Sequence, residues 1–123
     1  MRKELDDLLC QRYPDIFRDR NAGEEQTCMC RGFCCGEGWF DIINDLCAEI
    51  TARVAAGEMP PVVATQVKSK TGYLRFYFKN RAANPQARAL VEDAQFRSEF
   101  TCEECGGFGL GCRCPQPLRM RHF

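Results

Sequence analysis

The clearest pattern of apolar and polar positions lies in the middle of the chain, over residues 62–79. Residues 62–67 form a short run rich in β-branched side chains, and apolar residues then alternate with polar or aromatic ones from 73 to 79. This period of two is that of a β-strand with one buried face. The buried positions would be Leu74, Phe76 and Phe78. Because Gly72 can adopt a positive φ in the intervening turn, the pattern predicts an antiparallel hairpin over 62–79.

Helical periodicity lies on both sides of this hairpin. Residues 39–56 carry apolar side chains at three- and four-residue steps, and Gly57 is placed to end that helix. Further helices are predicted over 3–13 and over 86–100, the latter with Pro85 at its first turn. The fold class expected is therefore α+β: a central antiparallel hairpin packed against two or three helices, with a metal-binding knuckle at the carboxyl end.

Cysteine usage adds metal chemistry to this picture. Eight of the ten cysteines fall into two tight clusters, at 28–35 and 102–114, a spacing typical of metal ligands rather than of scattered disulfides. The remaining two, Cys10 and Cys47, lie on or beside apolar helical stripes and are predicted core residues. The first residues contain no uninterrupted apolar stretch, and no run is long enough to span a bilayer. We therefore expect a cytoplasmic protein with reduced thiols, some of them bound to metal.

The second cluster gives the stronger metal signal. Cys102 and Cys105 have the Cys-x-x-Cys-Gly spacing of a zinc knuckle, and tetrahedral zinc needs two further ligands. Cys112, Cys114 and His122, the only histidine, are the candidates for those two positions. The predicted organisation is a core over 1–101, which includes a cysteine loop at 28–38, followed by a zinc-knuckle tail over 102–123.

The first cluster leaves alternatives open. Its thiols could bind a second zinc among themselves, Cys28 and Cys30 could complete a site with the second cluster, or the loop could hold partly buried thiols. Adjacent cysteines rarely both reach one ion, so Cys34 or Cys35 would be spare. An iron–sulfur cluster is a further alternative for either group. The thiols concerned are Cys28, Cys30, Cys34 and Cys35.

Charge is unevenly distributed although the net charge is zero. Residues 1–58 carry twelve acidic and seven basic side chains, whereas residues 59–91 carry six basic ones and no acid. The outward side of the hairpin would thus combine bases with aromatic rings, and this side is the predicted partner-binding surface. Its members are Lys68, Lys70, Tyr73, Arg75, Tyr77 and Lys79. The alternative is an ordinary solvated face of the sheet.

Three motifs carry a resemblance to a known family. The motifs are Cys35-Gly36-Glu37-Gly38-Trp39, Gln66-Val67-Lys68-x-Lys70-x-Gly72-x-Leu74-Arg75-Phe76-Tyr77 and Ser98-x-x-x-Cys102-x-x-Cys105-Gly106. Together they resemble a family of small cysteine-containing proteins encoded by bacteriophages and prophages. In that family the terminal knuckle usually ends in a Cys-x-x-His-like pair, whereas this chain has Cys112-Arg-Cys114 and a distant His122. The resemblance implies a phage or prophage gene product acting in the bacterial cytoplasm, and it implies no catalytic residues.

Three function classes follow from these observations. An enzyme is not expected, because no phosphate-binding glycine loop, dinucleotide fingerprint or nucleophile–histidine pair is present and zinc with four protein ligands has no open position. A zinc-binding interaction protein that binds and modulates or inhibits a host protein complex is the preferred hypothesis. Anti-defence activity, such as anti-CRISPR or anti-restriction inhibition, is its specific form. The alternative is a zinc-stabilised nucleic-acid module that uses the basic and aromatic side of the hairpin.

Overall fold

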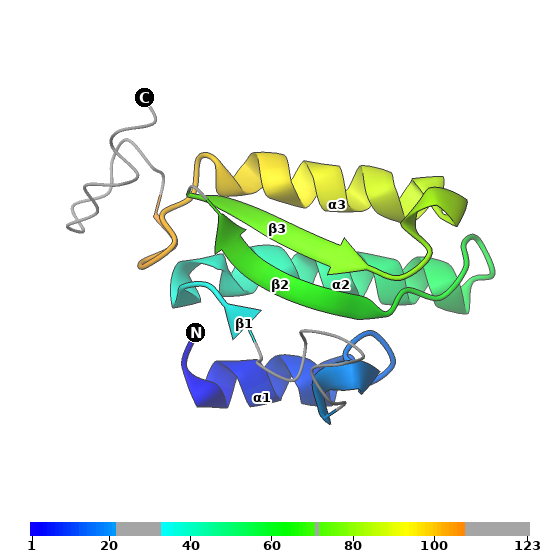
Figure 1. Ribbon diagram of the computed structural model, residues 1–123, viewed down its shortest axis with the longest axis horizontal. Helices are drawn as coiled ribbons and strands as arrows, with labels where there is room; N and C mark the ends of the chain where they lie inside the picture. Colours follow the sequence, from blue (N-terminus) through cyan, green and yellow to red (C-terminus); the bar gives the residue numbers. More distant parts are fainter. Residues whose placement is uncertain (22–32, 71, 108–123) are drawn as a thin grey trace.

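The computed structural model describes residues 1–21, 33–70 and 72–107, and it confirms the α+β class and the antiparallel hairpin (Figure 1). The sheet has the order β1-β2-β3, in which β2 and β3 are antiparallel and β1 pairs parallel to β2. The helices are α1 (Lys3–Arg12), α2 (Phe40–Ala55) and α3 (Pro85–Ser98), with short 3-10 turns η1 (Arg18–Asn21), η3 (Glu37–Trp39) and η4 (Arg81–Ala83). The strands are β1 (Phe33–Cys34), β2 (Ala64–Lys70) and β3 (Tyr73–Phe78).

Strand β1 departs from the sequence-based expectation. The glycine- and cysteine-rich stretch 28–38 was not expected to form a regular element, yet Phe33 pairs with Val67 and Cys34 with Lys68. The reason is tertiary: the edge of β2 offers backbone hydrogen-bonding groups, and even two residues lower the cost of leaving that edge unpaired.

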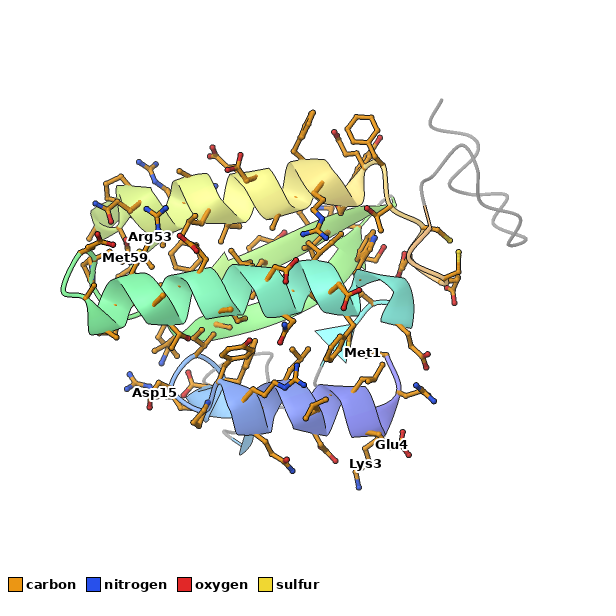
Figure 2. The ribbon with its side chains drawn as sticks, turned by 180° about the vertical axis from the view of Figure 1, so that it is seen from behind. Met1, Lys3, Glu4, Asp15, Arg53 and Met59 are labelled. Atoms are coloured by element: carbon orange, nitrogen blue, oxygen red, sulfur yellow. The ribbon has the colours of Figure 1, made fainter. Side chains whose placement is uncertain are left out.

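Two helices cover one face of the sheet, and none of the helices in the described ranges covers the other. Figure 1 shows β2 and β3 in front of α2, and Figure 2, seen from behind, shows α2 and α3 in front of the strands. The core lies between these layers. The alternation along β3 correctly predicted which of its side chains are buried there. The fully or nearly buried side chains of the core include Trp39, Ile43, Cys47, Ile50, Val67, Leu74, Phe76 and Phe78. Removing this apolar surface from water stabilises the fold by about 25 cal/mol per Å².

Local sequence signals fix the ends of α2 and α3. At the end of α2, Gly57 has φ 76°, its N–H donates to the Val54 carbonyl, and the N–H of Glu58 donates to the Arg53 carbonyl. This is a Schellman cap, which glycine favours because it has no Cβ. At the start of α3, the Asn84 side chain accepts from the Ala87 N–H. The same side chain donates to the Pro60 carbonyl, so the cap of α3 is tied to the loop that follows α2.

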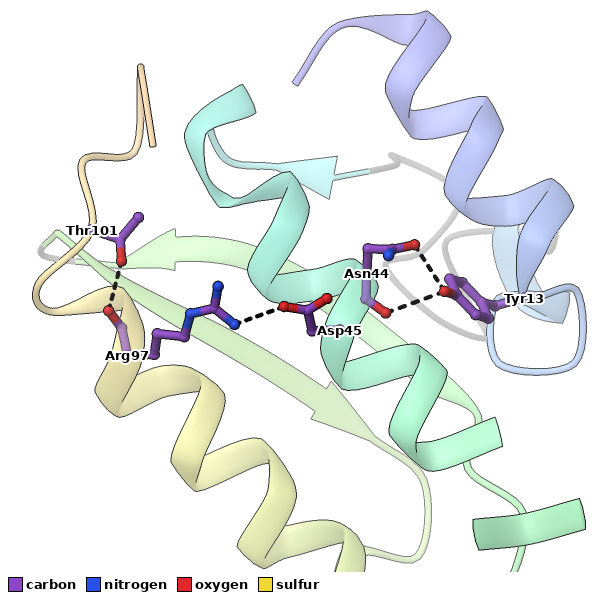
Figure 3. A network of polar contacts seen from close by, with 5 residues as sticks. All are labelled: Tyr13, Asn44, Asp45, Arg97 and Thr101. Carbon is purple, nitrogen blue, oxygen red and sulfur yellow. Dashed lines mark hydrogen bonds and ion pairs between the residues drawn. The ribbon is translucent and has the colours of Figure 1, made fainter. Parts of the chain in front are cut away.

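Helix α2 is also the element to which the other two helices attach (Figure 3). The Tyr13 hydroxyl, just after α1, donates to Oδ1 of Asn44 at 2.8 Å and contacts its carbonyl at 3.2 Å. The next residue of α2, Asp45, forms an ion pair with Arg97 of α3 at 2.9 Å. The Arg97 carbonyl in turn accepts from the Thr101 hydroxyl, so one turn of α2 positions α1, α3 and the start of the 101–107 loop.

The free edge of β3 is closed by side chains of α3. The Leu74 N–H donates to the Ser98 hydroxyl at 3.0 Å, and the Phe76 N–H donates to Oε1 of Gln95 at 3.2 Å. Ser98 is fully buried and donates to the Gln95 carbonyl. An edge whose N–H groups are satisfied in this way is a poor template for pairing with another strand. Within the described ranges, no helix combines the length and the apolar character that crossing a bilayer requires.

This edge closure gives the first prediction. Ser98→Ala should leave the buried Leu74 N–H without its acceptor and lower the free energy of unfolding by about 1–3 kcal/mol. Urea unfolding followed by circular dichroism measures the loss. The control is Gln86→Ala, at an exposed position of the same helix, which should stay within about 0.5 kcal/mol of the wild type. Equal stabilities for the two variants would show that the serine is dispensable for the edge.

Candidate functional site

The Cys102–Gly107 segment forms a closed loop directly after α3. The Cys102 N–H donates to the Gly107 carbonyl at 2.8 Å, and the Gly106 N–H donates to the Cys102 carbonyl at 2.9 Å. Gly106 has φ 77°, a conformation that residues with a side chain rarely adopt. Cys102 is 1% exposed, whereas Cys105 is exposed. The loop therefore closes through a glycine turn, and the zinc knuckle expected here stays a prediction.

The loop is packed against the Cys35–Trp39 segment from the other end of the sequence. The Gly38 N–H donates to the Glu103 carbonyl at 2.6 Å, and the Trp39 indole N–H donates to the Thr101 carbonyl at 3.0 Å. A Cβ built on Gly38 would lie 2.1 Å from the Cys102 carbonyl oxygen, and one on Gly36 would lie 2.3 Å from that of Glu103. Only glycine allows the two backbones to approach this closely.

Glu103, between the two knuckle cysteines, connects three parts of the fold. Its Oε2 accepts from the Gly36 N–H at 2.9 Å, and its Oε1 accepts from the Ser69 hydroxyl near the end of β2 at 2.9 Å. Hydrogen bonds to a carboxylate are stronger than those between neutral groups. Sequence reasoning missed this residue because an acid between two cysteines looks like a solvated loop residue. The knuckle is thereby joined to the strand that carries Lys68 and Lys70.

The predicted metal ligands are only partly described. Cys35, Cys102 and Cys105 lie in the segments just discussed, and Cys35 is 6% exposed. Among the described residues, no group of three or more histidine, cysteine, aspartate or glutamate side chains could hold a metal ion. The side chain of Cys34 and the residues Cys28, Cys30, Cys112, Cys114 and His122 lie outside the described part. The identity of the zinc ligands therefore stays a prediction.

Cys47 is confirmed as a core residue. Its side chain is fully buried on the inner face of α2. Burial and, next, the neighbouring Cys10 raise the pKa of the Cys47 thiol far above its ordinary value. Because the thiolate is the form that binds metal, this cysteine is a poor ligand at neutral pH.

The second feature of the site is the face of the hairpin that α2 and α3 do not cover, here called the sheet face. The register pairs Gln66 with Tyr77, Lys68 with Arg75, and Lys70 with Tyr73. The sheet face is thus Gln66, Lys68, Lys70, Tyr73, Arg75 and Tyr77, all half-buried except the exposed Lys70. The ammonium of Lys68 lies 5.7 Å from the centre of the Tyr77 ring, which is a cation–π distance.

Two basic side chains, Lys68 and Arg75, stand directly opposite each other on this face. Like charges at opposed positions destabilise a sheet. Unfavourable local arrangements such as this pair of opposed cations are found in natural proteins mainly at functional sites.

Lys79, which the sequence pattern grouped with the same face, lies one residue beyond β3. Its ammonium forms an ion pair with Asp19 of η1 at 2.8 Å, and the Asp19 side chain is only 15% exposed. The structure therefore places Lys79 at a contact between η1 and the end of the hairpin. Replacing it would disturb that contact as well as the surface charge.

The close approach of Gly38 to the knuckle gives a second prediction. Gly38→Ala should displace the 101–107 loop, because the added Cβ meets backbone rather than a movable side chain. Trp39 is the only tryptophan of the chain and donates to Thr101, so its fluorescence spectrum reports this displacement directly. The control is Gly57→Ala, where nothing lies within 4 Å of the added Cβ; it strains the backbone but should leave the Trp39 emission unchanged. An unchanged Gly38→Ala spectrum would contradict the packing described here.

A third prediction concerns zinc. Freshly purified, reduced protein should contain at least about one zinc per chain, since a structural site needs four ligands and the knuckle supplies two. Cys102→Ser and Cys105→Ser should lower the zinc content measured by elemental analysis, and Cys10→Ser, outside both clusters, should not. Iron in place of zinc would indicate a cluster. Freshly purified, folded protein in which elemental analysis finds no metal would remove the zinc hypothesis.

The candidate site thus consists of a knuckle held against the 35–39 segment and a basic, aromatic sheet face, joined through Glu103 and Ser69. The sequence predicted both features separately, and the structure brings their supporting segments into contact. No protein-family model, curated protein sequence or solved structure matches this chain, so its function has to be argued from these contacts.

Proposed function

We propose that the chain is a zinc-stabilised interaction protein whose sheet face binds an acidic surface of a host protein complex and modulates or inhibits it. The observation that carries the proposal is the opposed pair Lys68 and Arg75, flanked by Tyr73 and Tyr77 on the face opposite to α2 and α3, which no described helix covers. Tyrosine and arginine are the residue types that contribute most to binding energy at protein interfaces. A partner with carboxylates opposite this pair would relieve the repulsion between the two cations.

The geometry also restricts how the partner approaches. Because Ser98 and Gln95 occupy N–H groups along the edge of β3, the partner lies across the sheet face rather than extending the sheet by another strand. The zinc knuckle would act at a distance from the contact, by holding Glu103 and through it Ser69 of β2.

The resemblance to phage-encoded proteins supports a bacterial host complex as the partner. A defence complex such as a restriction or CRISPR effector is the specific partner proposed. The role of zinc in this proposal is structural.

A nucleic-acid partner is the second candidate, since aromatic rings among cations on an exposed sheet suit base stacking and phosphate contact. Two observations favour a protein instead. The cations of the sheet face are Lys68, Lys70 and Arg75, which would give a salt slope of only about −2 for a single strand. In addition, Lys68 already lies against the Tyr77 ring that a base would need.

Affinity capture from host cells, with and without nuclease, tests the proposal. The wild type should recover one protein complex that survives nuclease, and Lys68→Glu/Arg75→Glu should lose it. With the purified complex, Tyr73→Ala should weaken binding by about thirtyfold or more if the ring is a hot spot costing about 2 kcal/mol.

The matched control is Arg81→Glu/Arg88→Glu, which changes the net charge equally at exposed positions outside the sheet face. This variant should still recover the complex. Equal loss in both double variants would indicate a general charge effect. Recovery of nucleic acid alone, released by modest salt, would replace the proposal with the second candidate.

A further inference from the structure

The helical layer presents an acidic surface on the side of the molecule opposite to the sheet face. Exposed acids occur along both helices: Asp41, Asp45 and Glu49 on α2, and Glu92 and Asp93 on α3. Two of them are paired with arginine, Asp45 with Arg97 at 2.9 Å and Glu49 with Arg53 at 2.8 Å. These pairs are exposed and contribute little to stability, so a partner that offers its own cations loses little by replacing them.

A groove of about 180 Å³ runs between α2 and α3 on this surface. Its apolar floor and charged walls are formed by Ile42, Leu46, Leu90, Ala94, Asp45, Glu49, Asp93 and Arg97. This volume is below the roughly 300 Å³ at which small-molecule sites begin, so the groove suits an inserted side chain better than a free ligand. An aromatic or long aliphatic side chain fits the apolar floor, and positively charged residues next to it fit the acidic walls.

The sheet face supplies such side chains. Tyr73 and Tyr77 provide rings, and Lys68, Lys70 and Arg75 provide the positive charge. The two surfaces lie on opposite sides of the same molecule, as Figures 1 and 2 show from the two directions. Because the whole chain has zero net charge, two copies do not repel each other as they approach.

We infer that the α2/α3 groove of one copy binds the sheet face of a second copy, in a weak head-to-tail contact. Since the contact joins two different surfaces, each copy can bind a further one. The assembly then grows unless the rotation that relates successive copies closes a ring. Each contact covers one sheet face, so the partner complex of the proposed function has to displace a neighbouring copy. The inference rests on the sheet face of that proposal but does not depend on the identity of the partner.

Sedimentation velocity of the purified, metal-loaded full chain tests this contact. At about 0.01 M salt, where charges act over roughly 30 Å, the wild-type sedimentation coefficient should rise with protein concentration. At about 1 M salt, where that length is roughly 3 Å, the rise should disappear. Lys68→Glu/Arg75→Glu and Glu49→Lys/Asp93→Lys should each sediment as monomers at low salt.

Mixing the two variants is the decisive measurement. The first keeps an intact groove and the second keeps an intact sheet face, so the mixture should associate although neither variant does so alone. Because the two altered surfaces carry exchanged charges, they complement each other as well. The control for charge is Glu4→Lys/Asp15→Lys, which changes the net charge as the groove variant does, at exposed positions on the α1 side of the molecule, and should associate like the wild type.

Wild-type protein that stays monomeric at low salt, a groove variant that associates like the control, or a mixture that forms no dimer would each overturn the inference. None of these outcomes touches the proposed function, which is decided by the affinity capture. The two failures are therefore distinguishable.

Discussion

Strand β3 can bury only one of its two faces, and the rest of the structure depends on which face that is. Leu74, Phe76 and Phe78 point toward α2 and α3 and are at most 6% exposed. The period of two then sends Tyr73, Arg75 and Tyr77 to the other side, where none of the described helices lies. A slip of one residue in register would exchange the two sets, so the core and the candidate binding surface are fixed by the same constraint.

The helices that cover the buried face also limit how the sheet can be used. Ser98 and Gln95 of α3 accept from N–H groups of β3, which leaves its open face rather than its edge as the place for contact. On the other side of the hairpin, the Ala64 N–H donates to the Ile16 carbonyl, and β1 pairs with Val67 and Lys68. These hydrogen bonds satisfy backbone groups along both edges of the hairpin, so the edges are poor templates for pairing with another strand.

Residues 102–107 pack against the rest of the fold. Gly36 and Gly38 allow the backbone of this segment to lie against η3, and the Glu103 carboxylate reaches both Gly36 and Ser69. Metal binding at Cys102 and Cys105 would therefore affect the residues next to Lys68 and Lys70. Charge of opposite sign on opposite faces is compatible with the zero net charge of the chain.

The sequence alone determined the elements whose signal is local. The alternation along β3, the apolar stripe of α2, the glycine that ends it and the proline that begins α3 all act within a few residues, so pattern reasoning placed the hairpin, the helices and the inward side chains. It also grouped five of the six predicted contact residues on one face.

The tertiary structure decided the contacts between distant segments. These are the parallel pairing of β1, the closure of the β3 edge by α3, the ion pair of Lys79 with Asp19, and the bond from Gly36 to Glu103 across 67 residues. Such contacts depend on the paths of loops and on which backbone groups remain unsatisfied after the core has formed, and no periodicity along the chain encodes either quantity.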